Sequence, residues 1–289
     1  MKNKKDPMIL YFDIETTPLK SFLWQPGQQY VGHKNLLPSH EMWDLICIQY
    51  AINDGPVKVL RYDKHGGTKG MIKTFDALVR KADIVLGKNS DRFDIKMLNS
   101  LRMFHGLPGL PEWNKYSEDL EKQMRRHFRL PSQSLDYISR MLGVGGKISM
   151  GMDDWVDISN MRELTTLKDS GLDTKSLSKV SLHLFKEKTP IIMKRGKEAL
   201  HKMCTYGAKD TEDTRVIWHY LKEHFEPRMN MATWKGEKHV CKACGSADIK
   251  KNGTRAAGKT MYQQFHCNDH GGYAGRAPIS KHGVVGKIG

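Results

Sequence analysis

The sequence predicts an α/β fold, a mixed β-sheet flanked by helices, with a small separate module near its C-terminal end. The run MILYFDI at residues 8–14 is continuously apolar, which is typical of a strand buried on both faces. Further strand patterns lie at residues 45–52, 57–62 and 84–86, and helical spacing of apolar residues follows the second and third of these. Strands that alternate with helices indicate helices layered on a sheet.

The predicted elements have recognisable boundaries. The turn Asn53–Asp54–Gly55–Pro56 joins strands 45–52 and 57–62 into a hairpin. The polar stretch 153–188 is expected to contain loops and short helices. Helices are expected at 68–81, at 91–104 with Ser90 or Asp91 as the cap, at 132–142, and at 193–225 with a break near Gly207 and an end at Pro227.

Length and composition indicate one domain of catalytic size with a small appendage. The chain has 289 residues, of which 39% are hydrophobic and 27% charged, as in soluble globular proteins. No apolar stretch approaches the roughly 18 residues of a membrane span, so no membrane partner is expected. The basic N-terminus soon runs into acidic residues and lacks a signal-peptide cleavage site, which predicts a cytoplasmic location, in a bacterium or a phage-infected host cell.

The net charge of +15 and the pI of about 9.5 favour a partner with negative charge. A lysine-rich surface on an ordinary soluble protein is the alternative. The charge is uneven, because residues 230–289 carry ten Lys or Arg against three Asp or Glu. Nucleic acid is therefore the expected partner.

Two acidic residues end the first predicted strand. Asp13 and Glu15 are two positions apart, and strand side chains alternate, so both carboxylates point to the same side. Like charges placed in this way repel each other, and a cation between them would explain the pair. A strand end at which both acids face water is the alternative.

Three residues further along the chain carry candidate chemistry. Asp94 lies in the first turn of a predicted helix, where the helix dipole alone would also favour an acid. Tyr206 and Asp210 are four residues apart on a predicted helix and share one of its faces. The nearby Glu212 and Asp213 indicate that this helix also carries solvated acids.

In this order, the residues resemble the motifs of the DEDD 3′→5′ exonucleases, which include the proofreading domains of DNA polymerases. Thr205 stands where the histidine subclass has His, so the chain resembles the tyrosine subclass (DEDDy). The segment SLDYISRMLGVGGK is similar to a helix and loop in the exonuclease domains of family B polymerases. The motif D-x-E matches Asp13 and Glu15, Asn followed by Phe-Asp matches Asn89, Phe93 and Asp94, and Y-x-x-x-D matches Tyr206 and Asp210.

The resemblance covers residues 8–225 and implies an RNase H-like fold with two-metal exonuclease activity. Four carboxylates would bind two Mg²⁺ or Mn²⁺, which activate water and stabilise the departing 3′ oxygen. Tyr206 would orient the attacking water, and the products would be nucleoside 5′-monophosphates. No polymerase domain follows, which implies a free-standing relative. The metal ligands would be Asp13, Glu15, Asp94 and Asp210.

Thr16 and Thr17, Asn89 and Phe93 are candidates for contacts to the terminal nucleotide, with Phe93 able to stack on a base. Core packing is the alternative for Phe93. The expected substrate is the 3′ end of single-stranded DNA in replication, recombination or repair, and a protein of those processes is a further candidate partner. Three alternatives remain: an RNA exonuclease, an idle nucleic-acid-binding protein on the same fold, and an endonuclease or resolvase.

A second cluster of candidate ligands lies near the C-terminal end. Cys241 and Cys244 are followed, after 22 intervening residues, by Cys267 and His270, and three thiolates with one imidazole suit a closed tetrahedral zinc site. Three unligated thiols in a disordered basic tail are the alternative. The expected task of this module is holding nucleic acid, because it carries the surplus of charge, and protein docking is the alternative.

This stretch resembles the small zinc ribbons of transposases and related phage and bacterial proteins. Those ribbons usually have Cys where His270 stands, so His266 and His239 are alternative fourth ligands. A module with so small a core would depend on one structural zinc ion to fold. The predicted domains are an exonuclease domain at 1–228, a zinc-ribbon module at 229–275 and a basic flexible tail at 276–289.

Overall fold

Contacts between residues divide the chain into two compact units. One unit is Ile9–Ile217, and the other combines Met1–Met8 with Trp218–Gly289. In the described part of the chain, no helix has both the length and the apolar character needed to cross a membrane. The computed structural model describes residues 7–21, 23, 25, 30–37, 42–110, 117–145, 148–171, 178–224, 240–242, 245–269, 271–280 and 283–286.

The first unit is built on a five-stranded mixed sheet. Its order is β3-β2-β1-β4-β5, in which β2 is antiparallel to β1 and β3, while β4 is parallel to β1 and β5. This confirms the predicted hairpin and the predicted mixed sheet, and the order is compatible with an RNase H-like fold. The strands are β1 (Ile9–Thr16), β2 (Leu45–Ile52), β3 (Lys58–Arg61), β4 (Ile84–Gly87) and β5 (Ser117–Asp119).

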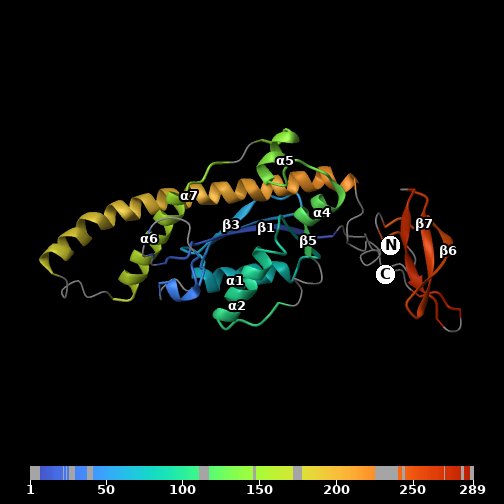
Figure 1. Cartoon of the computed structure of the whole chain (residues 1–289), viewed down its shortest axis with the longest axis horizontal. Helices are drawn as coiled ribbons and strands as arrows, with labels where there is room; N and C mark the ends of the chain where they lie inside the picture. Colours follow the sequence, from blue (N-terminus) through green and yellow to red (C-terminus); the bar gives the residue numbers. More distant parts are fainter. Residues whose placement is uncertain are drawn as a thin grey trace. The chain divides into compact units, whose positions relative to one another are not determined.

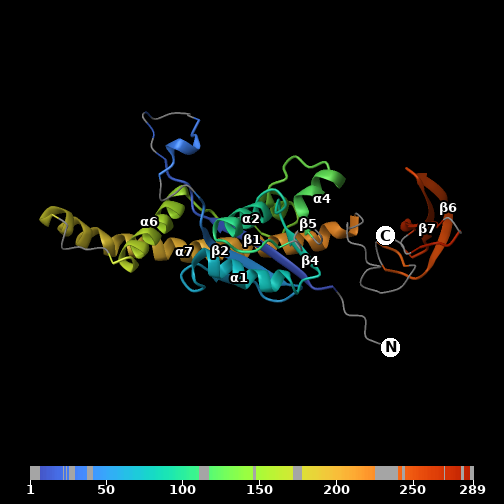
Figure 2. The ribbon, with the colours of Figure 1, turned by 90° about the horizontal axis from the view of Figure 1, so that it is seen from below.

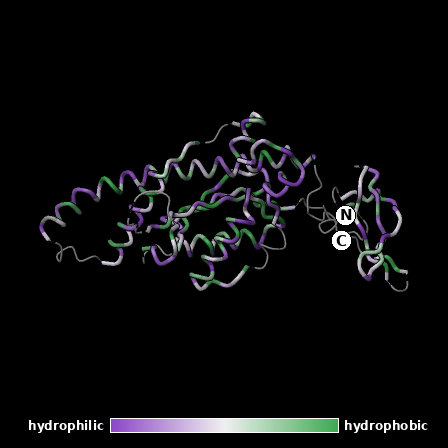
Figure 3. Tube along the Cα trace, viewed as in Figure 1, coloured by the Kyte–Doolittle hydropathy of each residue, from purple (hydrophilic) through white to green (hydrophobic). Residues whose placement is uncertain are grey.

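Helices cover both faces of this sheet (Figures 1 and 2). Apolar residues of β1 and β2 pack on one face against helices α1 (Gly67–Val79) and α2 (Asp94–Phe104). On the other face, Ile46 and Cys47 of β2 pack against α6 (Met152–Asp169) and the long helix α7 (Lys179–Leu221). The hydropathy colouring in Figure 3 shows the apolar residues gathered along the strands between these two layers.

Helix α7 differs from the prediction, because it continues without a break at Gly207. Gly207 is buried, and a Cβ at this position would lie 2.1 Å from Nε2 of Gln49 on β2. The glycine therefore permits a close approach of the helix to the sheet, and the helix does not end there. The predicted end at Pro227 lies outside the described residues.

The stretch 153–188 also differs from the prediction of loops and short helices. It contains most of α6 and the start of α7, which runs through Pro190. Trp155, Ile158 and Met161 recur every third residue and pack against α7, so a helical apolar face lies hidden among polar residues.

Three shorter elements refine the prediction further. Helix α2 begins at Asp94 after a turn, so neither Ser90 nor Asp91 is its cap. Helix α5 (Leu135–Met141) is shorter than predicted and is capped by Ser134, whose Oγ accepts from the Tyr137 N–H at 3.3 Å. The short strand β5 and helix α4 (Leu120–His127) were not predicted.

The second unit contains a three-stranded antiparallel sheet, called here the C-terminal sheet: β6 (Ile249–Ala257), β7 (Thr260–Cys267) and β8 (Tyr273–Pro278). The flexible tail was predicted to begin at Arg276. Strand β8 instead continues to Pro278, and an isolated β-bridge pairs Ile279 with Val285. The predicted domain boundary between residues 228 and 229 lies outside the described residues. The small core consists of Cys241, Phe265, Cys267, Ala274 and Ala277.

Candidate active site

The first two candidate acids lie on the face of β1 that meets α7. In the β1–β2 register, Glu15 is opposite Cys47, which packs with α7, and Asp13 is opposite Gln49, which lies beneath Gly207. Alternating residues of β1, such as Phe12, point to the α1–α2 face instead. Both carboxylates therefore point to the same side, as the two-residue spacing predicts.

Asp94 reaches these acids from α2. Its Oδ1 accepts a hydrogen bond from the Ile14 N–H at 3.1 Å, and the side chain is 3% exposed. The parallel pairing of β1 with β4 covers Ile9 to Tyr11, so the Ile14 N–H lies beyond the end of that ladder. The carboxylate of Asp94 satisfies this amide and thereby fixes the first turn of α2 beside the end of β1.

Tyr206 and Asp210 reach the same place from α7. Tyr206 is 7% exposed, packs with Ile46 and Cys47, and donates a hydrogen bond from its hydroxyl to Asp210. The adjacent Gly207 brings this turn of the helix onto β2. The four-residue spacing thus places both side chains on the helix face that meets the sheet.

Electrostatic interactions join the four carboxylates into one cluster, called here the acid cluster: Asp13, Glu15, Asp94 and Asp210. Burial raises the pKa of Asp13 well above its usual range, and the other three carboxylates raise it further. Burial also raises the pKa of Asp94 to about 7, although hydrogen bonds from its own N–H and that of Ile14 oppose the shift. Acids from β1, α2 and α7 therefore lie within one another's electrostatic field.

The hydroxyl of Tyr206 remains protonated in this environment. Burial raises its pKa well above the usual value, and the negative charges of Asp210, Glu15 and Asp13 raise it further. At neutral pH this side chain can therefore donate and accept hydrogen bonds, but it cannot act as a base.

The donor set of the acid cluster fits a hard divalent cation. Its four side chains offer only oxygen atoms, which Mg²⁺ and Mn²⁺ prefer. Among the described residues, no three His, Cys, Asp or Glu side chains already close around one point as a metal site. Repelling carboxylates are expected to stay apart until a cation neutralises them.

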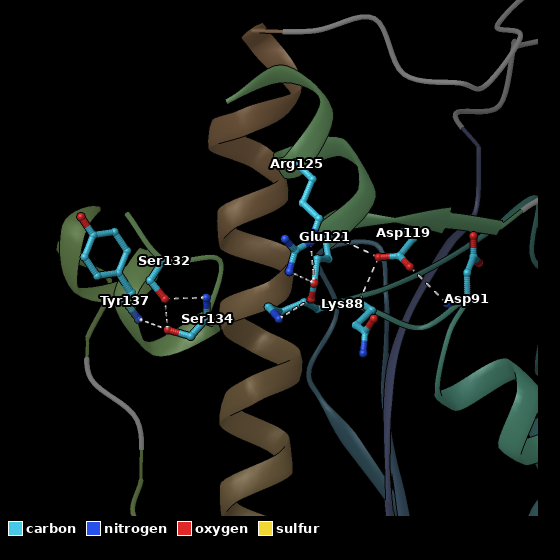
Figure 4. A network of polar contacts seen from close by, with 9 residues as sticks. Lys88, Asp91, Asp119, Glu121, Arg125, Ser132, Ser134 and Tyr137 are labelled. Atoms are coloured by element: carbon cyan, nitrogen blue, oxygen red, sulfur yellow. Dashed lines mark hydrogen bonds and ion pairs between the residues drawn. The ribbon is translucent and has the colours of Figure 1, made fainter. Parts of the chain in front are cut away.

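Lys88, at the end of β4, is a candidate functional residue that sequence reasoning missed. Its ammonium lowers the pKa of both Asp13 and Asp94, so it lies within electrostatic reach of the acid cluster. An ion pair of 3.0 Å with Glu121 on α4 holds it in place, and Arg125 binds the same carboxylate (Figure 4). The sequence indicated Lys88 only by its position, directly before the candidate residue Asn89 and at the end of a predicted strand.

Asp119 is a second residue that sequence reasoning missed. Its carboxylate accepts the N–H groups of Asn89 at 2.9 Å, Asp91 at 3.2 Å and Glu121 at 2.9 Å (Figure 4). These bonds fix the loop between β4 and α2 and cap α4. Burial raises the pKa of Asp119, although the three N–H groups oppose the shift.

The candidate nucleotide contacts occupy different environments. Phe93 is 43% exposed, which does not support the core-packing alternative. Asn89 has a positive φ of 59°, and its backbone is tied to Asp119. Thr16 is partly buried at the end of β1, whereas the hydroxyl of Thr17 accepts from the Asp44 N–H at 3.1 Å and is occupied.

Two of the candidate zinc ligands lie in the described residues. Cys241 and Cys267 are both buried in the core of the C-terminal sheet. His266 neighbours Cys267 in β7, so strand alternation turns its side chain to the opposite face, which disfavours it as the fourth ligand. Cys244, His270 and His239 lie outside the described residues.

Comparison with known proteins gives a distant structural likeness. The chain is similar to the family B DNA polymerase from the hyperthermophilic archaeon Pyrobaculum calidifontis, with a TM-score of 0.40 and 15% sequence identity. The match covers 90% of this chain and 32% of the polymerase, and a likeness this distant carries no inference about activity. No protein-family model matches the sequence, and no curated protein matches it.

Proposed function

We propose that this protein is a divalent-metal-dependent 3′→5′ exonuclease that releases nucleoside 5′-monophosphates, with single-stranded DNA as the favoured substrate. The observation that carries the proposal is the acid cluster, in which a buried Asp13 lies close enough to carboxylates from β1, α2 and α7 for them to raise its pKa further, beside the hydroxyl of Tyr206. Such a cluster is costly for a fold unless a cation offsets its charge.

In this proposal each residue has a defined role. Asp13, Glu15, Asp94 and Asp210 hold two Mg²⁺ or Mn²⁺. When bound, the ions would supply activation of water and stabilisation of charge on the departing oxygen. Tyr206 remains protonated and orients the attacking water through its hydroxyl, and its hydrogen bond to Asp210 fixes the direction of that hydroxyl.

Residues around the acid cluster would position the substrate. Lys88 presents a positive charge beside the acids, where a phosphodiester must approach. The exposed ring of Phe93 offers a surface for the terminal base, and Thr16 and Asn89 offer polar groups nearby. The C-terminal sheet, with one structural Zn²⁺ bound by Cys241, Cys244, Cys267 and His270, would provide a further contact to nucleic acid.

The test uses single strands of DNA and RNA labelled at the 5′ end, with Mg²⁺ or Mn²⁺, and compares the wild type with Asp13→Ala. We expect a metal-dependent ladder that shortens from the 3′ end, at least a thousandfold slower in the variant because metal binding is lost. The control is Glu212→Gln on α7, which removes an acid that pairs with Arg215, and its rate should match the wild type.

The same assay separates the rival functions. A faster ladder on RNA than on DNA would move the substrate class to RNA while leaving the site unchanged. Internal cuts would instead favour an endonuclease. If the wild type and Asp13→Ala both bind the strands and neither shortens them, the exonuclease proposal fails and an idle binding protein replaces it.

A further inference from the structure

The C-terminal sheet has one buried face and one exposed face. In β7, Gln263, Phe265 and Cys267 are buried, whereas the residues between them are not. The strand register extends this division to β8 and assigns the residues of β6 to the same two faces, although β6 is exposed on both. The exposed face, called here the outer face, consists of Lys250, Arg255, Tyr262, Gln264, His266, Tyr273 and Arg276.

Cations and aromatic rings alternate on the outer face. The guanidinium of Arg276 lies 4.3 Å from the ring centroid of Tyr262, and the ammonium of Lys242 lies 5.1 Å from that of Tyr273. Arg255 is directly opposite Tyr262 in the register. A guanidinium stacked on a tyrosine keeps its second planar side exposed, and a nucleobase can stack there.

The charge of this module matches a polyanion. Residues 240–280 contain six Lys or Arg against two Asp. Both acids lie beyond the ends of the strands: Asp248 precedes β6 and accepts a hydrogen bond from Asn268 at 2.8 Å, and Asp269 follows β7. The outer face therefore presents positive charge together with stacking surfaces.

We propose that the outer face is a binding platform for single-stranded nucleic acid. Lys250 and Arg255 contact phosphates, and bases stack on the Arg276–Tyr262 pair and on Tyr273. A duplex fits less well, because its bases already stack on one another and cannot reach the aromatic rings. This inference takes its partner class from the proposed function but requires no hydrolysis.

The test measures the anisotropy of a labelled oligothymidylate of roughly 15 nucleotides, near the upper site size for small stacking modules, with the full-length chain. Divalent ions and chelators are both left out, so the strand is not cut and bound zinc is not removed. Tyr262→Leu should weaken binding about tenfold through lost stacking, while Tyr262→Phe should bind like the wild type. Arg255→Gln should lower the salt slope of log K by about 0.7.

Two neighbouring lysines provide a matched control. Lys250 is opposite His266 on the outer face, whereas Lys251 is opposite the buried Phe265 and so belongs to the other face. Lys250→Gln should weaken binding and lower the salt slope, and Lys251→Gln, with the same loss of charge, should change neither much.

The proposal is overturned if Tyr262→Leu and Lys250→Gln bind like the wild type, if Lys251→Gln is as damaging as Lys250→Gln, or if a duplex binds more tightly than the single strand. Thermal unfolding of each variant excludes a loss of fold. A failed exonuclease assay would not alter this binding result, so the two proposals can fail separately.

Discussion

Two aspartates of the central sheet, both with a pKa raised by burial, differ in the groups that surround their carboxylates. Asp119 accepts three backbone N–H groups, so its carboxylate is needed by the fold. Burial raises the pKa of Asp13, and the carboxylates around it raise that pKa further. The folded state therefore resists ionisation of Asp13. At a pH above the ordinary pKa of an aspartate, this side chain lowers the free energy of unfolding.

This contrast predicts opposite effects of the same substitution. Without added divalent ions, Asp13→Asn should leave the free energy of unfolding unchanged or raise it by about 1 kcal/mol, since it removes a repelled charge. Asp119→Asn should lower the free energy of unfolding by about 1–2 kcal/mol, because the NH₂ group of the new asparagine would face a backbone N–H. Urea unfolding at pH 8 measures both. An equal loss of stability in the two variants would make Asp13 a structural residue.

At the scale of elements, the contact between α6 and α7 depends on a glycine. A Cβ at Gly196 would lie 2.3 Å from the Cβ of Met161 and 2.9 Å from the backbone oxygen of Asp157. These atoms belong to the body of α6, and a rotamer change cannot move them away. The two helices can therefore pack at this position only without a side chain on α7.

Gly196→Ala should lower the free energy of unfolding by about 1–3 kcal/mol through overpacking. Helix propensity alone would raise it by up to about 1 kcal/mol, so the sign of the change is diagnostic. Glu198→Ala, at an exposed position two residues further along α7, should stay close to the wild type. Thermal unfolding that shows Gly196→Ala to be more stable would contradict this packing.

The elements that sequence predicts best are those with an uninterrupted apolar signal. The limits of β2 match the prediction at both ends, because LICIQYAI contacts helices on both faces of the sheet. Helix α6 was missed because its apolar residues are separated by polar ones. Gly207 was taken as a helix break, since only the position of Gln49 in three dimensions explains it.

The candidate site follows a similar rule. Spacing alone places Asp13 with Glu15, and Tyr206 with Asp210, on common faces, because strand and helix periods are fixed. The approach of Asp94 to β1 depends on the Ile14 hydrogen bond, which spans 80 residues of sequence, and the approach of α7 to the sheet depends on Gly207. Lys88 was not predicted because its partner Glu121 lies on α4, which the sequence pattern did not predict.

At the scale of the whole molecule, the two units differ in what can stabilise them. The first unit has apolar clusters on both faces of a five-stranded sheet. The C-terminal sheet has a core of four small or sulfur-containing residues and one Phe ring, in which Cys241 and Cys267 are central. A core of this size needs a further source of stability, and a zinc ion at the cysteines would supply it.

The central claim is that the acid cluster binds divalent cations, and a count of bound metal per chain tests it most directly. Mn²⁺ titration followed by electron paramagnetic resonance, with zinc analysis of the same sample, should give two Mn²⁺ and one Zn²⁺. Asp210→Asn should lose Mn²⁺ and keep zinc, whereas Cys267→Ser should lose zinc and keep Mn²⁺. The control Glu212→Gln should keep both metals. Absence of bound Mn²⁺, or an unchanged Mn²⁺ count in Asp210→Asn, would contradict the claim.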